Sequence, residues 1–427
     1  MNISTLYSKV LVAILLLSLL LGAFLIRFRQ FQGCGFFRDE PGTNTLSYRS
    51  VYEYFQPEHG ADPIEINGLF YYKFIQHPWQ EFTGRILHDD TVFTCRLSSL
   101  LGALIGLAVF FQLGKNYTDK YTALLATALL TVNGCHQFYS NYLRYHIFSI
   151  LAAILLTCAL GKILSKPNWQ NWFIYHCLTV TNIYTSLNNL TLLPAHWLII
   201  YLYTCSNSEH NQQYIKLRRG LITSALLSLL AFLPMPFWDS QALGRMSAYP
   251  PLSLNLYLNI YCCLVGLKEY LLHPTSLITL ISIAAFLAIG LKKAWQDYRI
   301  QKDLRLLTIS AWLIVPLITH WIISLIVQPL IITRNLIFIM PAFALLVSVG
   351  IKSLANSTYS KVILITLWLI IIPTLLSQCG HNVFYEWDEP INPRYYRVPM
   401  SECCRYPGDH ISGQLPSEKR KSSPSNF

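Results

Sequence analysis

The sequence predicts an all-α polytopic membrane protein with about eleven transmembrane helices and interfacial helices in its first outer loop. Hydrophobic residues make up 53% of the 427 residues and charged residues only 12%, and the mean hydropathy is +0.39. Soluble domains carry roughly a quarter charged residues, so this chain has too few polar side chains to cover a soluble protein of its length. The aromatic content of 14% fits helices anchored at two membrane–water interfaces.

About eleven apolar segments approach the length needed to cross roughly 30 Å of hydrocarbon. They lie near residues 10–26, 97–114, 121–134, 146–164, 172–184, 187–204, 219–237, 274–291, 306–327, 335–351 and 361–379. The first segment follows Lys9, lacks a small-residue cleavage site and precedes many further apolar segments. It therefore fits an uncleaved signal anchor better than a cleaved signal peptide.

The distribution of Lys and Arg predicts the orientation. If the N-terminus is cytoplasmic and each apolar segment crosses once, most cations between segments lie on the cytoplasmic side, as the positive-inside rule requires. Arg27 and Arg29, just after the first segment, are exceptions. The expected location is the plasma (inner) membrane, multi-pass, with a cytoplasmic N-terminus. Because the net charge of +11 is spread over short connections rather than gathered in one patch, no nucleic-acid partner is expected.

The transmembrane module is expected over residues 1–379, followed by a short polar outer tail over 380–427 that is partly disordered. Its first outer loop, residues 27–94, is rich in Asp and Glu. Segment 65–82 within that loop mixes aromatic with polar residues, as a helix in the membrane interface does. A second outer segment covers 238–273. Since we find no soluble catalytic domain, any chemistry must come from the outer loops and the helix ends.

The eleven cysteines include no CxxC pair and no metal-binding spacing. Several lie in or beside apolar segments, where cysteine behaves as a small hydrophobic residue. These are Cys158, Cys177, Cys262 and Cys263. Others lie outside the membrane in the predicted topology, so a disulfide among them is an open alternative. These are Cys34, Cys379, Cys403 and Cys404.

An acidic pair, Asp39-Glu40, follows shortly after the first span. A carboxylate near the membrane surface can deprotonate an acceptor hydroxyl, and a pair of carboxylates can hold a cation. The alternative is that both side chains are simply solvated in a wet loop. We therefore take Asp39 and Glu40 as candidate catalytic residues, with the metal unknown and a divalent cation as one option.

Three further polar residues stand near helix ends. His77 precedes Pro78 at the end of the aromatic segment, either as a substrate ligand or as an ordinary helix-end residue. Arg144 lies at the outer mouth of the fourth span, and Arg334 opens the tenth. A guanidinium at such a place either binds an anionic partner such as phosphate or snorkels to lipid phosphate. His196 lies mid-span, where a packed, hydrogen-bonded His is expected.

Several sequence motifs, taken in order, resemble the GT-C class of membrane glycosyltransferases, and in particular the protein O-mannosyltransferase-like family, which also resembles the lipid A aminoarabinose transferase. The motifs are FFRDEPGTNTLSYRS, FYYKFIQHPW, RLSSLLGALIGLAVFFQLGK, YTALLATALLTVNGCHQFYSNYLRYHIF and RNLIFIMPAFALL. The match runs over about 40–200 and again near 334–350, and it rests on the order and spacing of the motifs along the predicted spans.

The resemblance implies a polyprenyl-phosphate-sugar-dependent glycosyltransferase of the hexosyltransferase kind. It would move a sugar from a polyprenyl-phosphate carrier in the membrane to a hydroxyl of a glycan, lipid or protein acceptor at the outer face, with inversion. By the same resemblance Asp39 is the general base and Glu40 orients it or shares a cation. Arg144 and Arg334 bind the donor phosphate, and His77 binds substrate.

Some positions depart from the family pattern. Trp79 follows His77-Pro78 where a second Pro is common, Tyr142 stands where an acidic residue is frequent, and His146 stands where Tyr is frequent. These departures keep open the alternative of an inactive partner of a related transferase. A transporter or flippase of lipid-linked sugars is the other alternative, but it should have related halves with interrupted helices at mid-membrane, and we find neither in the sequence.

The predicted topology can be tested by labelling engineered cysteines with a membrane-impermeant reagent. Gly60→Cys and Arg245→Cys are expected to react from outside, because they lie in the two large outer segments. Thr118→Cys, His210→Cys and Tyr298→Cys are expected to react only after the membrane is opened. Labelling of Tyr298→Cys from outside contradicts the predicted number of crossings.

Overall fold

The computed structural model describes residues 3–30, 43, 46–55, 67–87, 92–206, 212–233, 253–267, 274–326, 332–355, 365 and 369–377. Within these residues every regular element is helical, which confirms the predicted all-α class. Asp39 and Glu40, the four outer cysteines considered for a disulfide, and the tail after residue 379 lie outside the described residues.

Six of the described helical segments are long and apolar enough to cross a membrane. They are α1 (Ile3–Gln30), α4 (Val92–Tyr117), α7 (His146–Ser165), α13 (Pro274–Gln301), α14 (Arg305–Ile326) and the continuous run of α15 (Thr333–Leu336), η7 (Ile337–Ile339) and α16 (Met340–Leu354). The chain thus has several apolar spans, as predicted, but the count of about eleven is not confirmed.

Five other described bundle helices are not among these six. They are α5 (Lys120–Val132), α8 (Trp169–Thr185), α9 (Leu192–Ser206), α10 (Gln212–Phe232) and α12 (Leu254–Val265). Polar caps set some of their ends: Asp119 caps the start of α5, Asn168 caps the start of α8, and Asn133 follows the end of α5. With its 13 residues, α5 is about 20 Å long at 1.5 Å per residue, which is less than the hydrocarbon thickness.

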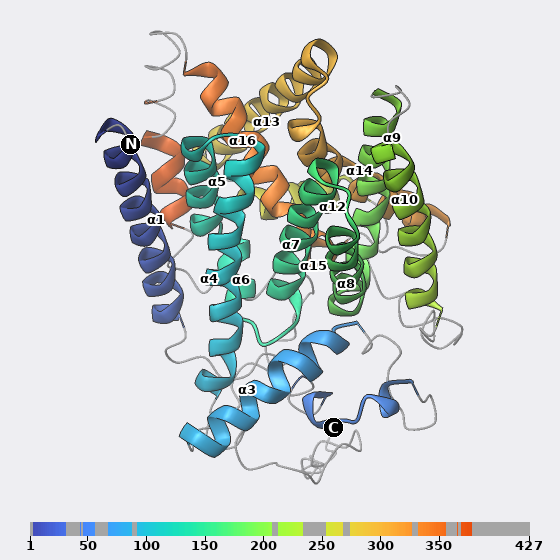
Figure 1. The fold of residues 1–427 in the computed structure, drawn as a ribbon. Helices are drawn as coiled ribbons and strands as arrows, with labels where there is room; N and C mark the ends of the chain where they lie inside the picture. Colours follow the sequence, from blue (N-terminus) through green and yellow to red (C-terminus); the bar gives the residue numbers. More distant parts are fainter. Residues whose placement is uncertain are drawn as a thin grey trace, which may run out of the picture.

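The bundle helices run side by side, with α1 at one edge (Figure 1). At the lower end of the view, α3 (His77–Phe82) lies across them instead of along them (Figure 1). Short helical segments connect the longer helices: α6 (Gly134–Ser140) comes between α5 and α7, and η6 (Leu187–Thr191) comes between α8 and α9.

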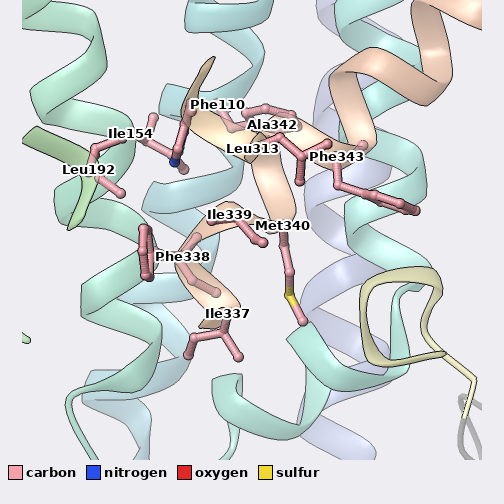
Figure 2. Close-up of a cluster of buried hydrophobic side chains, with 14 of the residues drawn as sticks. Phe110, Ile154, Leu192, Leu313, Ile337, Phe338, Ile339, Met340, Ala342 and Phe343 are labelled. Atoms are coloured by element: carbon pink, nitrogen blue, oxygen red, sulfur yellow. The ribbon is translucent and has the colours of Figure 1, made fainter. Parts of the chain in front are cut away.

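The core is built around the η7–α16 run. Figure 2 shows side chains of Ile337 to Phe343 among apolar side chains from α4, α7, α9 and α14. All of the labelled side chains are almost fully buried; examples are Phe338 and Leu192, each 0% exposed. The run that follows Arg334 therefore lies in the most buried of the candidate spans.

Two glycines let α13 and α16 approach closely. A Cβ atom on Gly350 would lie 1.9 Å from the carbonyl oxygen of Phe286, and one on Gly290 would lie 2.1 Å from that of Leu346. Each glycine therefore faces the backbone of the other helix. Small residues at such crossings allow the backbone contact on which helix association in membranes depends.

Arg27, an exception to the charge rule, lies inside α1 and is fully buried. Its guanidinium donates to Ser140 Oγ at 3.0 Å, to the carbonyl oxygen of Thr131 at 3.3 Å, and to His136 Nδ1 at 2.9 Å. Because an arginine only donates, Nδ1 of His136 accepts and carries no proton. Burial, and then the charge of Arg27, hold the pKa of His136 well below its ordinary value. Arg27 therefore ties α1 to α6 and is not a loop charge.

A disulfide between Cys135 and Cys263 joins α6 to α12, with a Cα–Cα distance of 5.6 Å. The prediction that Cys263 behaves as a small hydrophobic residue is therefore wrong, although Cys262 beside it is a free, buried cysteine. The Asn133 side chain also donates to the carbonyl oxygens of Cys263 and Leu264. The two elements are thus joined by a covalent bond and by hydrogen bonds.

Replacing Gly350 with Ala is expected to lower the melting temperature of the protein in detergent. The added methyl group must push α13 away from α16, and overpacking of this kind costs roughly 1–3 kcal/mol. Gly106→Ala on α4 is the matched control, because nothing lies within 4 Å of its Cβ position and Ala favours a helix over Gly by about 1 kcal/mol. Equal melting temperatures for the two variants contradict the packing described here.

Candidate functional site

A continuous helix made of η4 (Tyr71–Gln76), α3 and η5 (Thr83–Leu87) crosses one end of the bundle (Figure 1). We call it the interfacial helix. It confirms a helix over most of the predicted segment 65–82; the helix begins at Leu69 and continues to Leu87, and its place at a membrane interface stays a prediction. Its middle contains Pro78, whose ring crowds the carbonyl one turn earlier in a regular α-helix. The π-helical η4 just before Pro78 has wider turns, with i→i+5 hydrogen bonds, which give this ring more room.

Gly68 starts the interfacial helix with a φ of +106°. A Cβ atom there would lie 2.6 Å from the ring of Tyr145 and 2.9 Å from that of Tyr72. Glycine is therefore required both by the backbone conformation and by the lack of space. The consequence is that the start of the interfacial helix lies directly against the segment that contains Arg144.

Arg144 lies between α6 and α7 and is partly buried. Its Nη1 atom donates to Tyr72 OH at 3.3 Å and to Thr43 Oγ1 at 3.5 Å. Tyr72 comes from the interfacial helix, and Thr43 comes from the first outer loop. The guanidinium thus joins three parts of the chain at one end of the bundle.

Arg334 lies on α15, far from Arg144 in sequence. The segment that follows α15, η7, packs against α7, and α7 starts at His146, two residues after Arg144. His146 is 4% exposed. The His146 ring packs against Tyr139 and Tyr145, with centroids 4.9 Å and 4.4 Å away. The structure therefore brings the two predicted arginines to the same end of the bundle.

Amide side chains connect the elements that carry these arginines. The Asn67 side chain donates to Tyr145 OH at 2.7 Å and accepts from the backbone N–H of Leu187 at 2.9 Å. The next residue, Asn188, donates to Asn335 Oδ1 at 3.0 Å. Segment η6 is therefore hydrogen-bonded to the start of the interfacial helix on one side and to α15 on the other.

His77 lies in the middle of the interfacial helix, which continues to Leu87. It therefore does not end a helix, as the simpler alternative required. Its ring is partly buried and meets the ring of Tyr48 edge-on, with centroids 5.3 Å apart. His77 lies on the same helix as Tyr72, which accepts a hydrogen bond from Arg144.

Sequence reasoning missed Tyr72, Asn67, Asn188 and Asn335, because aromatic and amide residues in short polar stretches carry no catalytic motif. The expectation for His196 can be checked directly. Its side chain is buried, with Nε2 3.3 Å from Thr157 Oγ1 and Nδ1 3.2 Å from Tyr175 OH. This confirms that His196 is a packed, hydrogen-bonded histidine.

Within the described ranges, no group of three or more His, Cys, Asp or Glu side chains lies close enough to hold a metal ion. The predicted pair Asp39-Glu40 is outside those ranges, so the divalent cation stays a prediction. Thr43 is the described residue nearest to this pair in sequence. It is fully buried and in contact with Arg144.

Comparison with known proteins gives a likeness in fold. No family model and no curated protein matches the sequence. One similar crystal structure is that of an oligosaccharyltransferase from Archaeoglobus fulgidus, tethered by a disulfide to an acceptor peptide that contains an NVT sequon. The TM-score is 0.54 at 11% sequence identity, and the match covers 88% of this chain and 56% of the oligosaccharyltransferase. The apo form gives a TM-score of 0.52 at 11% identity, covering 93% of this chain and 61% of that one.

This chain therefore spans less than two thirds of the length of the oligosaccharyltransferase. At this identity the likeness concerns the fold alone. The narrower resemblance to the O-mannosyltransferase-like family stays a prediction. Over the matched residues the chain has a fold similar to that of the archaeal oligosaccharyltransferase.

Proposed function

We propose that the protein is a glycosyltransferase that moves a sugar from a polyprenyl-phosphate carrier to an acceptor hydroxyl at the outer face of the membrane. The observation that carries this proposal is that Arg144 contacts Tyr72 and Thr43 at one end of a bundle whose fold is similar to that of an oligosaccharyltransferase. Arg334 is tied to the neighbouring segment η6 by the Asn188–Asn335 hydrogen bond. Both arginines were predicted from the sequence as ligands of the donor phosphate. The acceptor is of the glycan, lipid or protein kind.

The proposed reaction is a single displacement. Asp39 accepts the proton of the acceptor hydroxyl, whose oxygen attacks the anomeric carbon of the sugar. The bond from that carbon to the phosphate oxygen breaks, and polyprenyl phosphate leaves with the electron pair. Because attack and departure take place on opposite faces, the configuration at the anomeric carbon is inverted. Glu40 orients Asp39 or shares a divalent cation with it.

The leaving phosphate gains negative charge as the bond breaks, so fixed cations near it lower the barrier. Arg144 and Arg334 supply planar guanidinium groups that can form paired hydrogen bonds with phosphate oxygens. Tyr72 and Thr43, which contact Arg144, would hold its side chain while the carrier enters. His77 would contact the substrate from the interfacial helix.

Covalent geometry supports a role for Asp39 next to these groups. Asp39 precedes Thr43 by four positions, and four residues of chain span at most about 14 Å. The backbone of Asp39 therefore lies within about 14 Å of Thr43, which contacts Arg144. An acceptor hydroxyl between Asp39 and the phosphate would lie within reach of both.

Asp39→Asn is expected to reduce transfer by roughly 10²–10⁴-fold, because the amide cannot accept the proton. The melting temperature is expected to stay at the wild-type value, since a solvated loop position tolerates this exchange within about 0.5 kcal/mol. Both quantities can be measured on the purified protein with a polyprenyl-phosphate sugar as donor. Glu40→Gln is the control and should lose less.

Wild-type transfer by Asp39→Asn would show that another residue is the base. A wild-type protein that transfers no sugar, yet moves the lipid-linked sugar across vesicle membranes, would support the flippase alternative instead.

Arg144→Lys keeps the charge but loses the planar fork. A charged hydrogen bond contributes about 1.5–3 kcal/mol, so transfer is expected to fall by roughly 10–150-fold without loss of folded protein. Arg85→Lys is a matched control on the interfacial helix, because its side chain is 81% exposed. Equal transfer by the Arg144 and Arg85 variants would mean that Arg144 serves only to hold the interfacial helix or a lipid headgroup.

A further inference from the structure

The short 3₁₀ helix η6 contains two adjacent asparagines, Asn188 and Asn189. A 3₁₀ helix has three residues per turn, so successive side chains point about 120° apart around its axis. The two amide groups therefore face different parts of the bundle. One amide fixes η6 within the bundle, and the other connects η6 to the helix that carries Arg334.

Asn189 is the residue that fixes η6. Its side chain is fully buried. Its Oδ1 atom accepts from Ser149 Oγ at 2.7 Å, and its Nδ2 atom donates to the carbonyl oxygen of Ser149 at 3.0 Å and to Asn182 Oδ1 at 2.7 Å. Ser149 belongs to α7 and Asn182 to α8. Because the oxygen and the amide N–H groups of Asn189 have partners on two packed helices, η6 is held in one position.

Asn188 faces the other way, toward α14 and α15. Its Nδ2 atom donates to Asn335 Oδ1 at 3.0 Å, and its Oδ1 atom lies 3.4 Å from Nε2 of His320. His320 is 1% exposed in α14, and its Nδ1 atom lies 3.0 Å from the carbonyl oxygen of Pro316. That oxygen can only accept, so Nδ1 carries a proton and the ring is held with Nε2 toward Asn188. An amide has donors and an acceptor, so Asn188 can pair with Nε2 in either protonation state.

Helix α15 needs such contacts to keep its position. It has only four residues, and a helix this short is not stable alone. Asn335 is 8% exposed, and Arg334 precedes it directly in the chain. The hydrogen bond from Asn188 therefore limits the movement of the backbone that carries the Arg334 guanidinium.

The start of η6 is connected to the segment of the other arginine. Leu187 is the first residue of η6, where a backbone N–H has no partner within the helix. This N–H donates to Asn67, which in turn donates to Tyr145 OH. Tyr145 follows Arg144 in the chain. Hydrogen bonds thus run through η6 from the residue next to Arg144 to the residue next to Arg334.

We infer that η6 is a spacer that sets the distance between Arg144 and Arg334, and that Asn188, supported by His320, is a positioning residue for the phosphate site. The inference rests on the proposed function, in which both arginines bind the donor phosphate. Two guanidinium groups can act on one phosphate only when the segments that carry them are held at a matching separation. Asn188 contributes through Arg334 and has no contact with the substrate.

The first test measures the position of α15 without any substrate. Asn188→Ala removes both side-chain contacts, whereas Asn189 still holds η6. Amide hydrogen exchange over residues 335–339, measured by mass spectrometry on the full chain in detergent, is expected to become several-fold faster. Thr191→Val on the same helix is the matched control, because it loses only a hydrogen bond to the carbonyl oxygen of Asn188. Equal exchange over 335–339 in the two variants would overturn the inference.

The second test measures transfer from a polyprenyl-phosphate sugar. Asn188→Ala is expected to lower kcat/KM for the donor by roughly 2–10-fold, as the loss of one hydrogen bond does, and to leave KM for the acceptor unchanged. In the Arg334→Lys background the same change should add less than about twofold, because Asn188 acts through Arg334.

Equal losses in the wild-type and Arg334→Lys backgrounds would overturn the inference, since a residue that only stabilises the fold acts independently of Arg334. If the wild type transfers no sugar, the proposed function fails. The link between Asn188 and α15 is then still decided by the exchange measurement.

Discussion

A cation near the end of a membrane-spanning helix must be surrounded by polar groups, because a bare charge next to hydrocarbon is costly. Arg144 meets this requirement with Tyr72 of the interfacial helix and Thr43 of the first outer loop. The arrangement of the outer end follows from these contacts. The interfacial helix must start close to Arg144, and this start requires glycine at position 68.

Arg27 meets the same requirement in a different way. Its guanidinium is fully buried and donates to backbone carbonyl oxygens, to Ser140 and to the neutral ring of His136. Such contacts within one bundle bind helices to one another. Arg144 is only partly buried and has hydroxyl partners at the longer distances of 3.3 and 3.5 Å. Of the two arginines, Arg144 therefore has the surroundings that better suit an exchangeable ligand.

The sequence predicts the helical class and the interfacial helix because both depend on local patterns, namely long apolar runs and an aromatic–polar mixture. It places some helix ends wrongly: the apolar segment predicted over 187–204 begins as the short helix η6, and α9 starts only at Leu192. The disulfide between Cys135 and Cys263 is not predicted, since cysteine in an apolar segment has the pattern of a small hydrophobic residue. Their sequence separation of 128 leaves no local signal.

The candidate site shows the same division between local and long-range information. Residue type and place at a helix end are enough to single out Arg144 and Arg334. That they lie at the same end of the bundle depends on the packing of α7 against η7, and no spacing in the sequence contains this information. The proposed roles of Asp39 and Glu40 rest on the family resemblance and on the closeness of these residues to Thr43 in the sequence.

The two arginines are held by different means, and this difference bears on how a phosphate site could work. Arg334 lies on a helix of four residues, which is too short to be stable alone. Its position depends on the Asn188–Asn335 hydrogen bond and on the buried η7–α16 run that follows. Arg144 instead contacts Thr43 and Tyr72 of the interfacial helix. The position of Arg334 is thus set by the core, whereas the position of Arg144 depends on elements at the end of the bundle, where the proposed lipid-linked donor would enter.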